Sequence, residues 1–139
     1  MPARDLYHDI VVEALIAEGW AITDDPLFLG YGNRPMYVDL GAEKSTLAAE
    51  KDGHRIAVEI KSFTSKSPVD DLHDAVGQYN VYRDVLSDTE PDRALYLAIP
   101  NQAWEGIFSE RLGRLVIERQ RLLMIVFDER QGGIIKWIN

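Results

Sequence analysis

The segment that most constrains the fold is R-I-A-V-E-I-K-S, Arg55 to Ser62, because apolar and polar side chains alternate along it. Side chains two residues apart lie on the same face of a β-strand. One face of the predicted strand is therefore wholly aliphatic, formed by Ile56, Val58 and Ile60. The other face carries Ala57, Glu59 and Lys61. A charge buried without a partner is costly, so the two charged residues either form a same-face pair at the surface or serve chemistry.

The remaining sequence predicts helices and strands that alternate along one domain, residues 1–139. Helices are expected over residues 4–18, 67–87 and 102–120, the last in two pieces broken near Gly113. Further strands are expected at Met36–Leu40, Thr46–Lys51, Arg93–Ile99, Leu122–Phe127 and Ile134–Ile138. Residues 24–35 are rich in turn formers and are expected to form a loop. This order predicts an α/β fold with a central mixed sheet flanked by helices.

Two short signals refine this outline. Ser67-Pro68 is typical of a helix start, since serine caps the first turn and proline fits the first helical position. Asp52-Gly53 is a strong hairpin signal. With a two-residue turn there, paired residue numbers sum to 105, so that Glu59 faces Thr46 and Lys61 faces Lys44.

Charge and composition exclude several classes of protein. The formal net charge is −8, whereas proteins that hold DNA by bulk electrostatics are usually basic. Four arginines form a local basic cluster or, on the preferred interpretation, a solvated helix face: Arg111, Arg114, Arg119 and Arg121. The chain has no cysteine, and no apolar run reaches the roughly 20 residues that cross a bilayer. With a polar, acidic N-terminus that does not resemble a signal peptide, we expect a cytoplasmic protein without a membrane segment.

An upstream acid, Asp39, gives the charged strand a second interpretation. Two carboxylates can hold a hard cation such as Mg²⁺ or Mn²⁺ through oxygen ligands, and the cation can polarise a phosphate and activate water. A nearby lysine can offset charge that develops in the transition state. Asp39, Glu59 and Lys61 therefore fit metal-assisted phosphodiester hydrolysis.

The position of the first acid depends on the strand register. In the register set by a two-residue turn, Glu50 lies on the side of Glu59 but roughly 13 Å away. Asp39 reaches Glu59 only if the chain bends near Gly41, which a glycine permits. Asp39 is the preferred first acid, and Glu43 and Glu50 are the alternatives.

The sequence also resembles known families. Asp39 followed by Glu59-x-Lys61 resembles the PD-(D/E)xK nuclease superfamily. Over nearly its whole length the chain resembles the XisH family, the fdxN element excision controlling factors. Four segments carry this resemblance: Y-V-D-L-G-A-E-K (37–44), A-V-E-I-K-S-F (57–63), G-Q-Y-N-V-Y-R (77–83) and R-A-L-Y-L-A-I-P (93–100). The resemblance implies a restriction-endonuclease-like fold, a link to programmed site-specific DNA excision, and a small partner protein, XisI.

Carried over by residue, the resemblance implies that Asp39 and Glu59 bind the metal and that Lys61 is the catalytic lysine. Gln78 and Tyr82 match a Q-x-x-x-Y pattern that places two side chains toward the site or DNA in several such nucleases. Ordinary helix packing explains these two residues equally well. Glu13 could supply a further acid, although a solvated helix face is the preferred interpretation.

Residues outside this motif are interpreted as structural. No metal-ligand spacing relates His8, His54 and His73, which are expected at the surface or in packing. Trp20, Trp104 and Trp137 are expected to anchor the core or an interface.

Three functions fit the sequence. The first is a metal-dependent DNA endonuclease or a nuclease-like subunit of a recombination complex. The second is a non-catalytic scaffold of the same fold that controls excision by binding XisI, the recombinase or DNA. The third is an interaction module without DNA contact, whose strand edge or helical face pairs with a partner or a second copy.

Overall fold

One twisted sheet runs through the middle of the computed structural model, which describes residues 5–44 and 54–139. Its strand order is β1-β4-β5-β6-β7-β8. The bounds are β1 (Ala21–Asp24), β4 (Leu40–Lys44), β5 (His54–Ile60), β6 (Arg93–Pro100), β7 (Met124–Phe127) and β8 (Ile134–Ile138). β5, β6 and β7 are parallel, and the other neighbours are antiparallel. A separate two-stranded sheet pairs β2 (Leu27–Phe28) with β3 (Tyr37–Val38).

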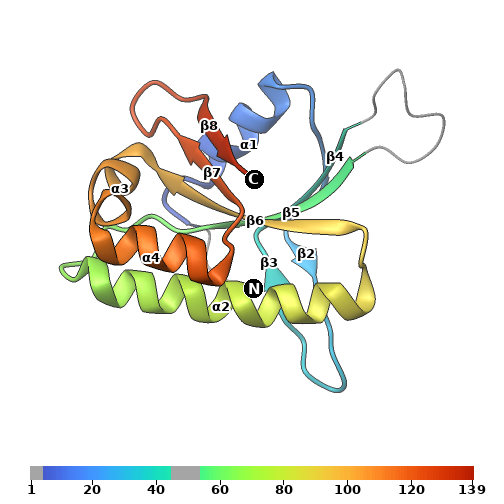
Figure 1. The fold of residues 1–139 in the computed structure, drawn as a ribbon. Coiled ribbons are helices and arrows are strands. Elements are labelled where there is room, and N and C mark those ends of the chain that lie inside the picture. Colours follow the sequence, from blue (N-terminus) through green and yellow to red (C-terminus); the bar gives the residue numbers. More distant parts are fainter. Residues whose placement is uncertain (1–4, 45–53) are drawn as a thin grey trace.

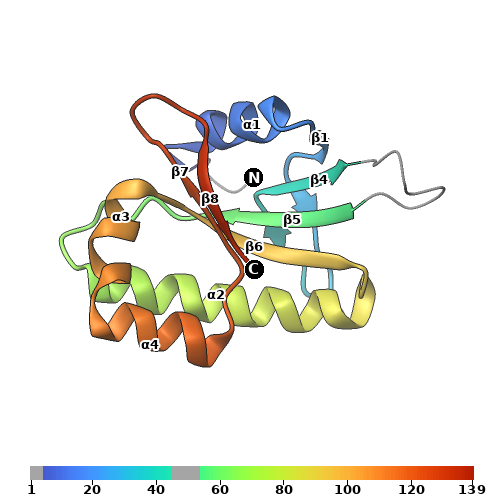
Figure 2. The ribbon, with the colours of Figure 1, turned by 45° about the horizontal axis from the view of Figure 1, so that its top comes forward.

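Helices cover both faces of the sheet (Figures 1 and 2). Helix α1 (His8–Ala17) lies on one face. The other face carries α2 (Pro68–Thr89), α3 (Asn101–Glu105), a 3₁₀ turn (Ile107–Ser109) and α4 (Arg111–Gln120). The predicted α/β class, with a central mixed sheet flanked by helices, is confirmed.

The alternation along β5 divides the core as the sequence predicts. Ile56, Val58 and Ile60 pack with Val11 and Leu15 of α1 on one face of the sheet. On the opposite face, the core under α2 contains Ala57, Leu72 and Tyr79. Burying each large aliphatic side chain stabilises the fold by about 1.5–3 kcal/mol, so this pattern fixes which face of β5 meets which helix.

Helix α2 begins where the capping signal predicts. The Asp70 N–H donates to Ser67 Oγ at 3.2 Å, and Pro68 is the first helical residue. The helix follows β5 and returns the chain to β6, which pairs parallel with β5. The long connection is therefore a β-α-β crossover that brings α2 over the face that carries Glu59.

The predicted hairpin register is wrong. Leu40 pairs with Val58 and Lys44 with His54, so paired residue numbers sum to 98. In this register Glu59 is opposite Asp39 instead of Thr46, and Lys61 is not opposite Lys44. The predicted strand Thr46–Lys51 and the Asp52-Gly53 turn lie outside the described residues.

The predicted strand Met36–Leu40 and the loop over residues 24–35 also need correction. The chain bends at Asp39, so that β3 ends at Val38 and β4 starts at Leu40. Val38 belongs to the core under α2 and Leu40 to the core under α1, because the bend moves the chain from the small sheet to the main one. The loop region itself contains β2, and β1 was not predicted.

The helical region over residues 102–120 breaks at Gly106 rather than near Gly113. Gly113 lies inside α4, where the 3₁₀ turn passes directly against it. A Cβ atom at this position would lie 2.2 Å from the Ile107 carbonyl oxygen and 2.5 Å from Phe108 Cα. Glycine is present here because two backbones approach closely, and it does not end the helix.

We predict that Gly113→Ala destabilises the protein by at least about 2 kcal/mol, because a methyl group meets backbone atoms that cannot move aside. Gly77→Ala is the matched control, since a Cβ on this exposed α2 residue meets no atom within 4 Å. That substitution should stabilise by about 0.5–1 kcal/mol through helix propensity. Chemical denaturation measures both values, and equal effects of the two substitutions would contradict the packing at Gly113.

Candidate functional site

Two hydrogen bonds join Asp39 to Glu59 and Ile60 at the end of the β4–β5 ladder. The Ile60 N–H donates to Asp39 Oδ2 at 2.7 Å, so the Asp39 carboxylate takes the place of a ladder carbonyl. In return, the Asp39 N–H points at Glu59 Oε1 at 3.4 Å. The bend at Asp39 is thus fastened to β5, and the two carboxyl groups are brought together.

Lys61 extends the same face of β5 beyond Glu59. Its Nζ lies 3.7 Å from Glu59 Oε2, and the lysine and glutamate side chains are 25% and 8% exposed. Its backbone N–H donates to the Ala98 carbonyl oxygen at 3.0 Å, which continues the pairing of β5 with β6 by one residue. Asp39, Glu59 and Lys61 therefore form one cluster, which we call the Asp39–Glu59–Lys61 site.

The carboxyl pair is short of positive charge. The pKa of Glu59 is raised to about 8, first by burial and then by the Asp39 charge, while Lys61 opposes the rise. Burial also raises the pKa of Asp39, against hydrogen bonds from Ile60 and Glu59 that lower it. Two close carboxylates in a poorly hydrated place cannot both ionise easily, so they share a proton or require a cation.

Asp39 and Glu59 are the two carboxylates that the described residues bring together at this site. Within residues 5–44 and 54–139, no group of three or more His, Cys, Asp or Glu side chains could hold a metal ion. Mg²⁺ commonly takes one or two carboxylates and completes its shell with water and substrate phosphates. The donor set therefore fits a cation that is only partly enclosed by protein.

Of the other predicted site residues that the structure describes, Tyr82 is near the Asp39–Glu59–Lys61 site, whereas Gln78 and Glu43 are not part of the cluster. Tyr82 of α2 is half-buried against the core under α2, and its pKa is raised first by burial and then by the charges of Glu59 and Asp39, which lie within electrostatic reach. Gln78, one turn earlier, is exposed. Glu43 is opposite Arg55, four residues and roughly 13 Å along β4 from Asp39, so it cannot share an ion with Glu59. Glu50 lies outside the described residues.

Comparison with known proteins identifies the chain's relatives. A sequence model described as XisH protein matches residues 1–135. The chain belongs to the XisH family.

Two crystal structures resemble this XisH-family chain over nearly its whole length. An XisH family protein from Nostoc punctiforme PCC 73102 has 34% sequence identity and a TM-score of 0.86, covering 97% of this chain and 100% of that chain. An fdxN element excision controlling factor protein from Anabaena variabilis has 38% identity and a TM-score of 0.86, covering 98% and 100%. No curated protein matches the chain.

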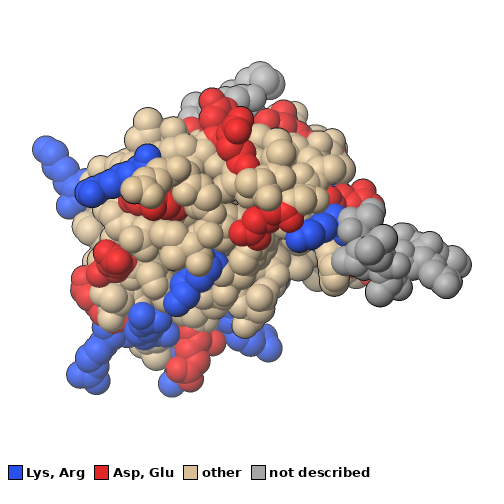
Figure 3. All heavy atoms as spheres, turned by 90° about the horizontal axis from the view of Figure 1, so that it is seen from above, with Lys and Arg blue, Asp and Glu red and all other residues tan. Residues whose placement is uncertain are grey.

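Figure 3, which looks onto the α1 face of this XisH-family chain, shows acidic and basic side chains scattered over a largely uncharged surface. No continuous basic patch covers this face among the described residues. The arginine cluster of α4 is exposed, as a solvated helix face requires, and Arg114 also lies over the Trp104 ring at 4.6 Å. Glu13 is exposed on α1. None of the described helices is both long enough and apolar enough to span a membrane.

The aromatic and histidine interpretations are mostly confirmed. Trp20 and Trp137 are half-buried and stacked on each other beside the core under α1, and Trp104 packs on the other core. His54 and His73 are exposed, whereas His8 is 4% exposed and belongs to packing.

Sequence reasoning missed Asp5 and the environment of His8. The pKa of Asp5 is raised by burial, and it responds to the charges of Asp39, Lys61 and His8, which places it beside the site. Asp5 Oδ1 accepts the Tyr7 N–H at 2.9 Å just before α1. His8 Nε2 lies 2.9 Å from Asp25 Oδ1. An aspartate three residues before the start of α1 was the available signal, but nothing local shows that this helix end meets β5.

The raised pKa of Glu59 predicts the direction of the pH dependence of folding. Its ordinary value is 4.5 and its folded value is about 8, so the folded state holds an extra proton between these values. The unfolding free energy should therefore fall as pH rises from about 5 to about 9 in the presence of a chelator, by at most about 1.4 kcal/mol per pH unit for this group. Glu59→Gln should flatten the slope and exceed the wild type in stability at the alkaline end.

Thermal and urea unfolding at several pH values measure this effect. Glu13→Gln, which removes an exposed carboxylate on α1, should keep the wild-type slope. If the unfolding free energies of the wild type and Glu59→Gln changed with pH in parallel, Glu59 would not be a carboxyl group with a raised pKa.

Proposed function

We propose that this chain is a nuclease-like DNA-processing protein, accessory to programmed DNA excision, that cleaves phosphodiester bonds with a divalent metal ion. The observation that carries the proposal is the close pair of a buried Glu59 and a half-buried Asp39, with Lys61 beside it. The spacing and chemistry of these residues fit the PD-(D/E)xK pattern. An ordinary surface ion pair between Glu59 and Lys61 would not need a second, half-buried carboxylate beside it.

Asp39 and Glu59 would hold Mg²⁺ or Mn²⁺, and the raised pKa values of both carboxyls in the absence of a cation support this assignment. A bound divalent ion neutralises phosphate charge and makes a water molecule more acidic. Lys61 would hold the attacking water or offset the charge that develops on the phosphate oxygens. Tyr82 lies within electrostatic reach of the same carboxyl pair and would contact the substrate backbone.

The link to excision comes from the relatives. The 38% identical protein from Anabaena variabilis is described as an excision controlling factor of the fdxN element. We propose the same process for this chain, acting in the cytoplasm on DNA together with an XisI-type protein. A homodimer is a further arrangement that would supply two copies of the site to a duplex.

The second candidate is a non-catalytic scaffold of the same fold that controls excision by holding XisI, the recombinase or DNA. The net charge of −8 favours it, because an acidic chain binds phosphates weakly without a basic partner. The two candidates differ at the Asp39–Glu59–Lys61 site, which a scaffold does not require.

We predict that Mn²⁺ and Mg²⁺ bind the wild type in a calorimetric titration and that Asp39→Asn and Glu59→Gln each remove this binding. Binding should weaken as the pH falls below about 8, since the cation displaces the proton that Glu59 holds. Glu13→Gln should bind as the wild type does. A metal signal that persists in both site variants would place the ion elsewhere.

Lys61→Ala separates an enzyme from a scaffold. It should leave folding and XisI binding unchanged but lower the rate of metal-dependent DNA cleavage at least about 100-fold, since a positioned charge in the transition state is lost. Lys66→Ala removes an exposed lysine and should cleave at the wild-type rate. If wild-type protein with XisI and Mn²⁺ leaves excision-site DNA intact, the proposal of a nuclease fails and the non-catalytic scaffold is the better account.

A further inference from the structure

The chain leaves β5 through an unusual backbone turn directly after Lys61. Phe63 has φ of +54°, a left-handed conformation that is uncommon for any residue except glycine. Its side chain is 8% exposed and meets the Phe108 ring edge-on, with ring centroids 5.2 Å apart. Such a conformation persists only where its surroundings hold it, and it often marks a functional constraint.

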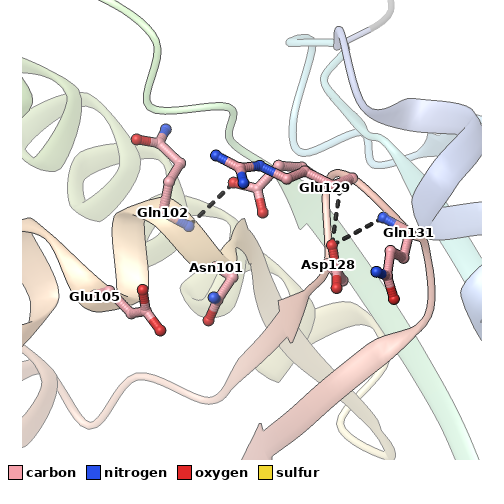
Figure 4. A pocket seen from close by; sticks show the side chains of 7 residues that line it. Asn101, Gln102, Glu105, Asp128, Glu129 and Gln131 are labelled. Carbon is pink, nitrogen blue, oxygen red and sulfur yellow. Dashed lines mark hydrogen bonds between the residues drawn. The ribbon is translucent and has the colours of Figure 1, made fainter.

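Gln102, at the start of α3, holds this turn. Its side-chain Nε2 donates to the Phe63 carbonyl oxygen at 2.9 Å and points at the Ser62 carbonyl oxygen at 3.4 Å. Its backbone N–H donates to Glu129 Oε2 at 3.0 Å, the hydrogen bond drawn in Figure 4. One residue thus joins the end of β5 to the start of α3 and to the turn after β7.

This contact lies beside a polar pocket of about 330 Å³ between α3 and the β7–β8 turn. Figure 4 shows Asn101 and Glu105 on the α3 side and Asp128 and Gln131 on the opposite side. Asp128 Oδ1 accepts the N–H groups of Arg130 and Gln131, both at 2.9 Å, so the turn is held by its own hydrogen bonds. The Gln102 backbone is therefore hydrogen-bonded to a turn whose own conformation is fixed by hydrogen bonds.

We propose that Gln102 is a positioning residue for Lys61, an inference that rests on the proposed role of Lys61 in the site. Lys61 N–H makes the last ladder bond of β5, to Ala98, so the chain direction beyond it is set by other contacts. The lysine side chain is long and flexible, and its reach depends on the backbone that carries it. By fixing the carbonyls of the next two residues, Gln102 keeps the Lys61 ammonium beside Glu59.

The alternative is that Gln102 only stabilises the junction of β6 and α3. Loss of a hydrogen bond would then lower the melting temperature by a few °C and leave Lys61 as ordered as before. Positioning predicts a change in Lys61 itself. The two roles are therefore separated by a measurement on the lysine side chain rather than on stability.

The test is the NMR order parameter of the Lys61 Cε methylene in protein labelled at lysine, free of metal and DNA. Wild-type Lys61 should be more ordered than exposed Lys66, and Gln102→Met and Gln102→Ala should lower its order parameter toward that of Lys66. Methionine keeps the volume of glutamine but donates no hydrogen bond. Gln131→Ala, which removes an amide across the pocket without contact to residues 62 and 63, should leave Lys61 unchanged.

An unchanged Lys61 order parameter in both folded Gln102 variants overturns the proposal. Where DNA is cleaved, both variants should lower kcat about tenfold or more with little change in KM, and neither should reduce the residual rate of Lys61→Ala further. If the wild type cleaves no DNA, the proposed function fails. The mobility of Lys61 then still decides whether Gln102 positions it.

Discussion

The site depends on two hydrogen bonds between the bend at Asp39 and strand β5, one to Glu59 and one to Ile60. The Asp39 carboxylate accepts the Ile60 N–H in place of a ladder carbonyl, and this fastens the bend between the two sheets to β5. The same geometry withdraws both carboxyl groups from water, Glu59 almost fully and Asp39 in part, and this raises the pKa of both. The fold thus keeps two neighbouring carboxyl groups whose charged forms are disfavoured, and a divalent cation is the partner that we propose for them.

The alternating faces of β5 and the Ser67 cap were predictable because each depends on residues close together in the chain. The register of β4 against β5 was mispredicted because it was taken from the local turn signal Asp52-Gly53 alone. The observed pairs sum to 98, so the two strands are not paired about residues 52 and 53. Residues opposite each other share a face, so Leu40 and Ala42 belong beside Val58 and Ile56. Matching apolar faces requires paired residue numbers with an even sum, which excludes 105 and puts Asp39 on the same face as Glu59. It does not by itself choose 98 among the even sums.

The rest of the site could not be inferred from local patterns. Asp5 approaches Asp39 and Lys61 only because α1 packs across the sheet, and Gln102 reaches Phe63 across 39 residues of chain. The break near Gly113 was mispredicted for a related reason. Glycine there permits two backbones to touch, and its local propensity to end helices does not decide the structure.

The central claim is that the carboxyl pair is a cation site, and anomalous X-ray scattering from crystals soaked in Mn²⁺ near pH 8 tests it most directly. The account predicts one peak within about 2.5 Å of an oxygen of Asp39 and an oxygen of Glu59, with Lys61 close by. A map without a peak there, in which the two carboxyl groups remain hydrogen-bonded to each other, would contradict it.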